Sequence, residues 1–181
     1  MSLFKKSMLV FLIVVICLIT TFASIFFLCF KTDFYNVIKI NAEKNNIDKA
    51  LIFSIIKAES KFNVNAKSKA NAIGLMQIKL STANYLLSIK NKQGISENEL
   101  YNPSTNIEIG VEYFTYLLNK FEVIETSICA YNAGETVVRE WLANINYSID
   151  GKTLKNIPYS ETNNYLKKVM FNYAVYKKIV K

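Results

Sequence analysis

Residues 8–30 form an uninterrupted run of 23 residues without a charged side chain. A helix of about 20 apolar residues is long enough to cross the hydrocarbon core of a bilayer. The run therefore predicts one N-terminal transmembrane helix, with the rest of the chain folding as a separate domain.

The charges on either side of the run predict its orientation. Lys5 and Lys6 precede it, whereas Lys31 and Asp33 follow it. Because positive charge is retained on the cytoplasmic side, residues 1–31 are expected to be a cytoplasmic N-terminus and transmembrane anchor. The remainder would then lie on the extracytoplasmic, or periplasmic, side of the cytoplasmic membrane.

Two alternatives to a permanent anchor stay open. A cleaved signal peptide has a shorter apolar core that ends in small residues, and the segment before Cys29 supplies no such exit. Lipidation of Cys29 is the second alternative, and the bulky Leu28 before it argues against that modification. A permanent anchor is the interpretation that the sequence favours.

The composition of the soluble part excludes several kinds of chemistry. The chain contains no histidine, which removes Ser–His and Cys–His nucleophile pairs and the commonest metal ligand. Two of the three cysteines lie in the apolar run, so Cys129 has no disulfide partner in the soluble part and is expected to be a core residue. Catalysis would depend on carboxylates, Lys, Tyr or amides, and neither a metal nor a cofactor is predicted.

The soluble part is moderately basic. Without Lys5, Lys6 and Lys31, 19 basic residues stand against 14 acidic ones, a net charge of +5. This excess suits attraction to an anionic wall or membrane surface, and it suits solubility equally well. Arg139 is the single arginine, and since bidentate base contacts rely on guanidinium groups, no nucleic-acid partner is predicted.

After about residue 33, apolar residues recur at three- and four-residue spacing without sustained alternation, which predicts a compact all-α domain. Residues 62–72 are expected to form a loop. The first expected helix runs from an N-cap at Asp48 to about Glu59, and the second runs from residue 81 or 82 through Leu87. A third begins at a capping box of Thr105 and Glu108, and a fourth covers 126–133 and stops at Gly134. Two more are expected over 137–142 and from about Ser160.

Glu59 differs from most other acidic residues because it ends an apolar helix, near Ile55, Ile56 and Phe62. The negative end of the helix dipole and the apolar neighbours both disfavour its charged form. Both effects raise the pKa, as a general acid working near neutral pH requires. A solvated Glu in the last turn of a helix is the alternative on these grounds alone.

Four blocks of the sequence form one ordered set of motifs over roughly residues 36–178. The blocks are Glu59-Ser60-Lys61-Phe62 with Ala66, Ser68 and Ala72-Ile73-Gly74-Leu75-Met76-Gln77; Leu100-Tyr101-Asn102-Pro103 with Asn106, Ile107, Gly110, Tyr113 and Leu117; Ala130-Tyr131-Asn132-Ala133-Gly134; and Ile157-Pro158-Tyr159-Ser160-Glu161-Thr162 with Tyr165 and Val169. In residues and in order, they resemble the lytic transglycosylase domain (SLT domain) related to goose-type lysozyme. Asn71 stands where that family usually has Gly, and Leu80 stands where it often has Pro, which puts local loop geometry in doubt.

The resemblance implies a lysozyme-like helical catalytic domain over residues 36–181 that acts as a peptidoglycan lytic transglycosylase, a carbon–oxygen lyase. In this family one Glu, matched by Glu59, protonates the glycosidic oxygen between N-acetylmuramic acid and N-acetylglucosamine. It then takes the proton of the C6 hydroxyl, which closes onto C1 as a 1,6-anhydromuramoyl end. The substrate's 2-acetamido group stabilises the charge at C1, so no second carboxylate need act as nucleophile, unlike in most glycosidases.

The same match implies a set of substrate-binding residues for the glycan strand: Ser68, Met76, Gln77, Tyr131, Asn132, Glu161 and Tyr165. Structural interpretations stay open beside it, because Ser68 could bond only to local backbone and Glu161 lies in a first turn that the helix dipole favours. Tyr131 could likewise pack in the core while Asn132 caps a helix. Trp141 is expected in the core.

Two other functions stay open. A hydrolase of the same bond would let water finish the reaction, which leaves a reducing end. A catalytically inactive peptidoglycan-binding or assembly protein would keep the groove alone, although a pure binder has no need for a poised acid. A membrane-anchored helical adaptor is disfavoured by the ordered sequence blocks.

Overall fold

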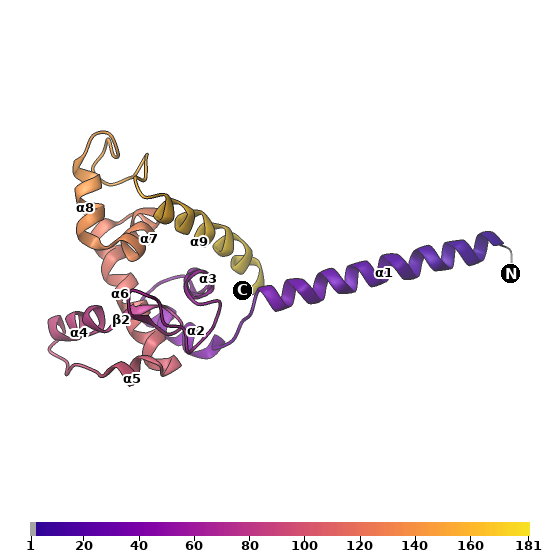
Figure 1. The fold of residues 1–181 in the computed structure, drawn as a ribbon, viewed down its shortest axis with the longest axis horizontal. Coiled ribbons are helices and arrows are strands. Elements are labelled where there is room, and N and C mark those ends of the chain that lie inside the picture. Colours follow the sequence, from indigo (N-terminus) through magenta and orange to yellow (C-terminus); the bar gives the residue numbers. More distant parts are fainter. Residues whose placement is uncertain (1–2) are drawn as a thin grey trace. The chain divides into compact units, whose positions relative to one another are not determined.

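The structure is a computed structural model that describes residues 3–181, apart from the side chains at positions 3–6, 9, 23, 25 and 27. The chain divides into two compact units, Met1–Thr32 and Asp33–Lys181. The first unit contains helix α1 (Leu3–Cys29), and the second contains all the other elements (Figure 1).

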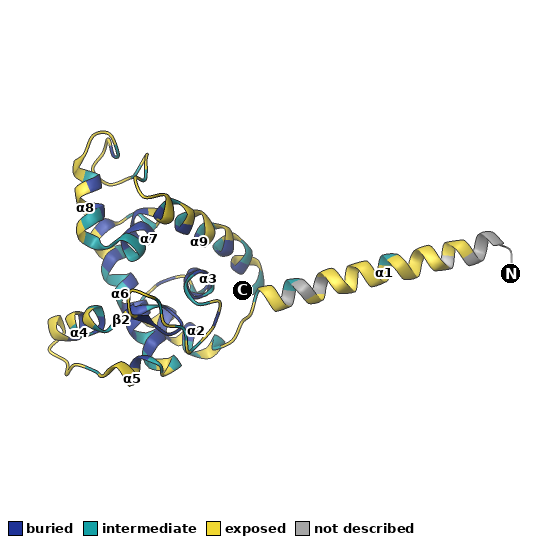
Figure 2. Cartoon of the chain, viewed as in Figure 1, coloured by how far each residue is buried: buried dark blue, intermediate teal, exposed yellow. Residues whose placement is uncertain are grey.

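Helix α1 exposes most of its described apolar side chains, Phe11 and Phe22 among them (Figure 2). Over the residues that the structure describes, no helix is both long and apolar enough to span a membrane. The transmembrane anchor therefore stays a prediction of the sequence.

The second unit is mostly helical, with one short antiparallel sheet that pairs Ala72 with Lys79 and Ile73 with Ile78. The all-α prediction missed this sheet, because strands of two residues are too short for alternation to show. The helix predictions also missed the helices at Tyr35–Lys44 and Glu97–Leu100. The elements are α2 (Tyr35–Lys44), α3 (Lys49–Glu59), β1 (Ala72–Ile73), β2 (Ile78–Lys79), α4 (Leu80–Ile89), α5 (Glu97–Leu100), α6 (Pro103–Phe121), α7 (Ile124–Ala133), α8 (Glu135–Ala143) and α9 (Ser160–Ile179).

Several predicted helix ends are confirmed. Asp48 is the N-cap of α3, and its carboxylate accepts a hydrogen bond from the N–H of Ala50 at 2.9 Å. Helix α7 ends at Ala133, and the predicted stop residue Gly134 is its C-cap, with a φ of +98° that suits glycine. Helix α9 begins at Ser160, as predicted.

The predicted capping box of Thr105 and Glu108 is wrong. The N-cap of α6 is Asn102, three residues before Thr105, and its side chain accepts from the N–H groups of Ser104 and Thr105. Pro103 occupies the first helical position, for which its fixed φ is suited. A capping box does occur at the start of α5, between Ser96 and Glu99, and sequence reasoning missed it although the two residues have the required spacing.

Helix α6 joins the two halves of the second unit, since it packs on α2, α4 and α5 at one end and on α7 at the other (Figure 1). The sequence also predicts one apolar stripe along this helix, made of Ile107, Val111, Phe114, Leu117, Leu118 and Phe121. All of these residues are buried except Leu118, which is half-buried. The core predictions for Cys129 and Trp141 are confirmed as well.

Helix α3 is buried along nearly its whole length, from Ala50 to Ile56, and packs on α9. Because α3 is held in the core, the position of its last residue, Glu59, is fixed as well.

Candidate active site

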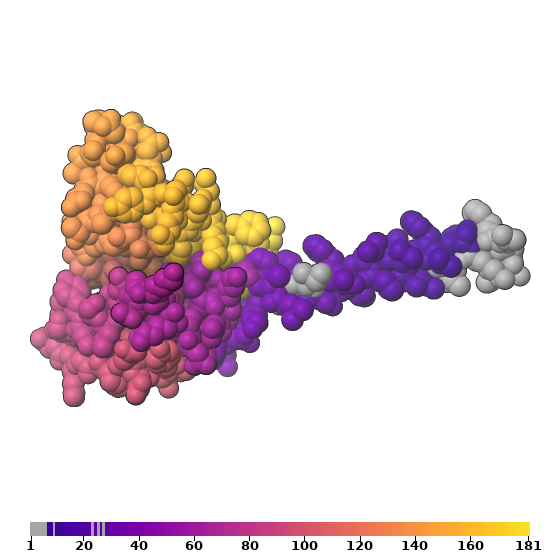
Figure 3. Space-filling model, viewed as in Figure 1, coloured from indigo at the N-terminus to yellow at the C-terminus, as the bar shows by residue number. Residues whose placement is uncertain are grey.

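A cavity of about 620 Å³ opens in the second unit, and its lining comes from the end of α3, from residues 68–82, and from α6, α7 and α9. In the space-filling view, the magenta and orange segments that supply much of this lining meet along a boundary (Figure 3). Six of the predicted site residues line the cavity: Glu59, Ser68, Gln77, Tyr131, Asn132 and Glu161. The side chains of Met76 and Tyr165 are buried and are not among the lining residues.

Glu59 is a half-buried carboxyl at the C-terminus of α3. Burial raises its pKa from 4.5 to about 7, and this rise is opposed by a hydrogen bond from Tyr165 and by the charge of Lys168. The hydroxyl of Tyr165 donates to Oε1 of Glu59 at 2.6 Å. A carboxyl with this pKa is available as an acid and as a base near neutral pH.

Two residues of α9 stabilise the ionised form of Glu59. Tyr165 acts through its hydrogen bond, and the Nζ of Lys168 donates to the carbonyl of Ala58, beside Glu59 in the chain. A cation at the C-terminus of α3 also offsets the negative end of the helix dipole. Sequence reasoning missed Lys168, although Glu161, Tyr165 and Lys168 share one helical face at four- and three-residue spacing.

Tyr131 combines the two roles that the sequence left open. Its ring lines the cavity, and it also packs at 5.5 Å from the ring of Tyr113 and at 6.1 Å from that of Phe114. Its hydroxyl donates to the carbonyl of Met76 at 2.7 Å, which joins α7 to the turn between β1 and β2.

Asn132 is oriented by a residue that sequence reasoning gave no role. The Oγ1 of Thr162, a buried residue in the first turn of α9, donates to Oδ1 of Asn132 at 2.8 Å. This bond uses the amide oxygen and so fixes which side of the amide carries its two donors.

Ser68 and Gln77 lie in the loop and turn that form the opposite wall. The Oγ of Ser68 accepts from the N–H of Ala72 at 3.0 Å, which leaves its hydroxyl proton as a donor. The amide nitrogen of Gln77 donates to the carbonyls of Ala66 and Gly74, so it stabilises the loop as well as lining the cavity.

A buried amide, Asn106, holds the turn between β1 and β2 in place. Its Nδ2 donates to the carbonyls of Ile73 and Leu100 at 2.9 and 2.8 Å, and its Oδ1 accepts from the N–H of Met76 at 2.8 Å. Gly74 lies against it with φ +75°, where an added Cβ would come within 2.4 Å of Nδ2. Sequence reasoning assigned Asn106 no such role.

Residues 36–154 match the family described as the Transglycosylase SLT domain. The chain belongs to this family. The Soluble lytic murein transglycosylase of Escherichia coli is 34% identical over 151 residues, which are 82% of this chain and 23% of that protein. Membrane-bound lytic murein transglycosylase E of Buchnera aphidicola is 47% identical over 88 residues, 48% of this chain and 40% of the relative.

A solved structure supports the fold of this SLT domain. The crystal structure of the 70 kDa soluble lytic transglycosylase of Escherichia coli has a TM-score of 0.73 and 31% identity, over 83% of this chain and 25% of that chain. The predicted lysozyme-like helical fold is thereby confirmed. The chain spans less than half the length of these relatives.

The structure explains both departures from the SLT family pattern. Asn71 adopts a φ of +58°, in the left-handed region that glycine favours and that Asn tolerates better than most residues. Leu80 is the first residue of α4, the position at which proline is favoured in helices. Both residues therefore suit the backbone that this chain adopts beside the cavity.

Within the described part of this SLT domain, no group of three or more His, Cys, Asp or Glu residues is arranged to hold a metal ion.

Tyr165→Phe is expected to raise the pKa of Glu59 above about 7, because the hydrogen bond from Tyr165 lowers that pKa. An NMR titration of the Glu59 carboxyl carbon measures the change. Tyr173→Phe is the matched control, since Tyr173 lies on the same helix but donates to Asp48. A lower or unchanged pKa in the Tyr165 variant would contradict the assigned role of the hydrogen bond.

Proposed function

We propose that the chain is a peptidoglycan lytic transglycosylase, with residues 36–181 as its catalytic domain. It cleaves the β-1,4 bond between N-acetylmuramic acid and N-acetylglucosamine and leaves 1,6-anhydromuramoyl ends. The observation that carries the proposal is Glu59, a half-buried carboxyl with a pKa of about 7 that faces a large cavity. The relatives named as lytic murein transglycosylases support the same reaction.

In the first step, neutral Glu59 donates its proton to the glycosidic oxygen as the bond from that oxygen to C1 breaks. Burial favours the neutral carboxyl that this step needs. The substrate's acetamido group stabilises the positive charge that develops at C1, so that a second carboxylate is not required in this role.

In the second step, ionised Glu59 takes the proton of the C6 hydroxyl while O6 bonds to C1. Between the two steps, the hydrogen bond from Tyr165 and the charge of Lys168 stabilise the carboxylate. Burial thus favours the neutral carboxyl of Glu59, whereas the contacts with Tyr165 and Lys168 favour the carboxylate. The balance keeps both protonation states accessible.

The substrate-binding roles follow from the lining of the cavity. Ser68, Gln77, Tyr131, Asn132 and Glu161 would contact the glycan strand. Met76 and Tyr165 would act as positioning residues, Met76 through the carbonyl that binds Tyr131 and Tyr165 through its bond to Glu59.

Mass spectrometry of digested wall sacculi tests the reaction. An anhydro end is lighter than a reducing end by one water, and we expect anhydro ends to accumulate with the intact chain. Products with only reducing ends would contradict the proposal and indicate a hydrolase. The absence of soluble products would also contradict it and indicate a binding protein.

The proposal includes a location: an N-terminal anchor in the cytoplasmic membrane, with the catalytic domain on the extracytoplasmic side. The uncharged run at 8–30 supports it. In α1 the hydroxyls of Thr20, Thr21 and Ser24 donate to carbonyls three or four residues earlier, so these polar groups need no water. Retention of the protein in carbonate-washed membranes is expected, and its release would contradict the anchor.

A further inference from the structure

Four tyrosines form a row that starts at the cavity and extends beyond it. The centroid of the Tyr113 ring lies 5.5 Å from that of Tyr131 and 6.3 Å from that of Tyr116, and the Tyr116 ring lies 6.3 Å from that of Tyr85. Tyr131 and Tyr113 line the cavity, whereas Tyr116 and Tyr85 are not among its lining residues.

The outer part of the row continues one end of the cavity. Tyr85 lies three residues after Thr82 on α4, and Tyr116 lies three residues after Tyr113 on α6. Thr82 and Tyr113 both line the cavity. Because residues three apart on a helix are neighbours on its surface, both outer tyrosines lie next to residues of the cavity wall.

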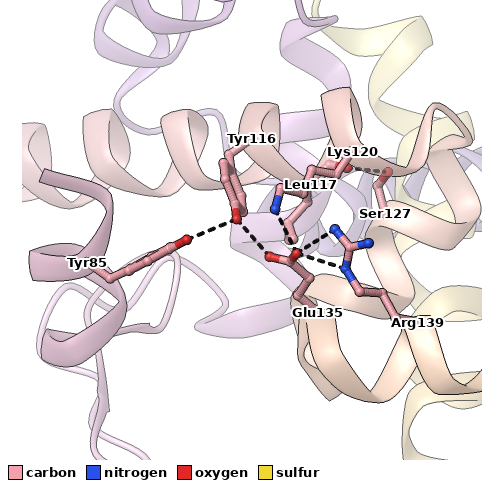
Figure 4. Close-up of polar contacts among 7 residues, drawn as sticks. All are labelled: Tyr85, Tyr116, Leu117, Lys120, Ser127, Glu135 and Arg139. Atoms are coloured by element: carbon pink, nitrogen blue, oxygen red, sulfur yellow. Dashed lines mark hydrogen bonds and ion pairs between the residues drawn. The ribbon is translucent and has the colours of Figure 1, made fainter. Parts of the chain in front are cut away.

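A network of polar contacts holds Tyr116 in place (Figure 4). The hydroxyl of Tyr116 donates to Oε2 of Glu135 at 2.9 Å and lies 3.3 Å from the hydroxyl of Tyr85. The other oxygen of Glu135 accepts from Lys120 at 2.9 Å and from Arg139 at 2.8 and 3.0 Å. Burial raises the pKa of Glu135, but these hydrogen bonds outweigh it and hold the pKa below its usual value.

The ring of Tyr116 is already occupied by contacts with the protein. Tyr113 lies alongside it at an interplanar angle of 16°, and the Nζ of Lys120 sits 4.7 Å from its centroid. Tyr85 stands nearly perpendicular to Tyr116 and is 51% exposed. Tyr85 is therefore the ring of the row that is accessible to a ligand, and Tyr116 positions it.

We propose that Tyr85 is the aromatic contact of a distal subsite that binds an amino sugar of the glycan strand beyond the cavity. The inference rests on the proposed function, since it takes the glycan strand as the ligand of the cavity. A tyrosine ring offers an apolar face and a polar edge, which match the apolar face and hydroxyl groups of a pyranose. A ring held in place by the Tyr116 hydroxyl loses little conformational freedom on binding.

The test measures affinity against ligand length. In a full-length Glu59→Gln protein, which prevents turnover, calorimetry follows the binding of β-1,4-linked N-acetylglucosamine oligosaccharides of increasing length. We expect Tyr85→Ala to weaken the binding of the long oligosaccharides by about 10-fold, and to leave the short ones unchanged. Tyr85→Phe keeps the ring and should retain most of the affinity.

Phe171→Ala is the matched control, because Phe171 is an aromatic residue on α9 that is 65% exposed and is not among the residues lining the cavity. Equal weakening at every length, or no weakening at any length, would overturn the distal subsite. Sacculus digestion with Glu59 intact decides the proposed function separately. If no glycan is cleaved, that function fails, while the length series in the Glu59→Gln protein still decides the subsite.

Discussion

Glu59→Gln is expected to lower the rate of glycan cleavage by about 1000-fold or more, because general acid catalysis contributes on this scale and the amide cannot donate a proton at neutral pH. Gln has the shape of Glu and can still accept the hydrogen bond of Tyr165. Oligosaccharide affinity should therefore change little. Release of anhydro products from sacculi, measured beside calorimetric binding, separates the two effects.

Glu161→Gln is the matched control for this experiment. Glu161 also lines the cavity, but it is exposed and lies in the first turn of α9. We expect a loss of less than about 10-fold, as for a substrate contact worth about 1 kcal/mol. A loss as large as that of Glu59→Gln would indicate a second catalytic carboxylate, as in most glycosidases.

The same Glu59→Gln substitution is expected to stabilise the fold at alkaline pH. Below pH 4.5 the carboxyl is neutral in both folded and unfolded chains, and its burial has little cost. As the pH rises from 4.5 to about 7, Glu59 ionises in the unfolded chain before it ionises in the folded chain. The free energy of unfolding therefore falls, by about 3 kcal/mol in full. Urea unfolding should show the variant to be more stable than the wild type at pH 8 and equal to it at pH 4, and equal stability at both would contradict the raised pKa.

The predicted features that proved correct depend on short-range chemistry. The N-cap at Asp48, the helix stop at Gly134 and the apolar stripe of α6 follow from contacts within a few residues. The wrong start of α6 has the same origin, because two local caps competed and the combination of Asn102 with Pro103 prevailed over Thr105.

The environment of the acid was only partly predictable. Apolar neighbours in α3 indicated a raised pKa for Glu59, but its two stabilising partners come from α9. Tyr165 is 106 residues away along the chain, and Lys168 is 110 residues from the carbonyl that it binds. Helical spacing could place these residues on one face of α9, but only the packing of α3 on α9 determines what that face contacts.

Met76 shows another limit of sequence reasoning. Its motif predicted a groove-lining side chain, but the side chain is buried against Gly110, where an added Cβ would come within 2.4 Å of its sulfur. The backbone of Met76 instead joins two walls of the cavity, through its N–H to Asn106 and its carbonyl to Tyr131. A motif identifies a position without stating whether its side chain or its backbone is used.

Asn106→Ala is expected to lower the free energy of unfolding by about 3–5 kcal/mol, because it leaves three buried backbone groups without their partner. These groups are the N–H of Met76 and the carbonyls of Ile73 and Leu100. Asn172→Ala is a matched control of equal size change, since Asn172 is similarly buried and its Nδ2 has no hydrogen-bond partner in the described part of the chain. Urea unfolding of the two variants separates the effect of the hydrogen bonds from that of the lost volume, and equal destabilisation would show that packing alone accounts for the effect.

Because the Met76 carbonyl binds Tyr131, the rate of glycan cleavage by the folded fraction of Asn106→Ala should also fall, whereas Asn172→Ala should leave that rate unchanged.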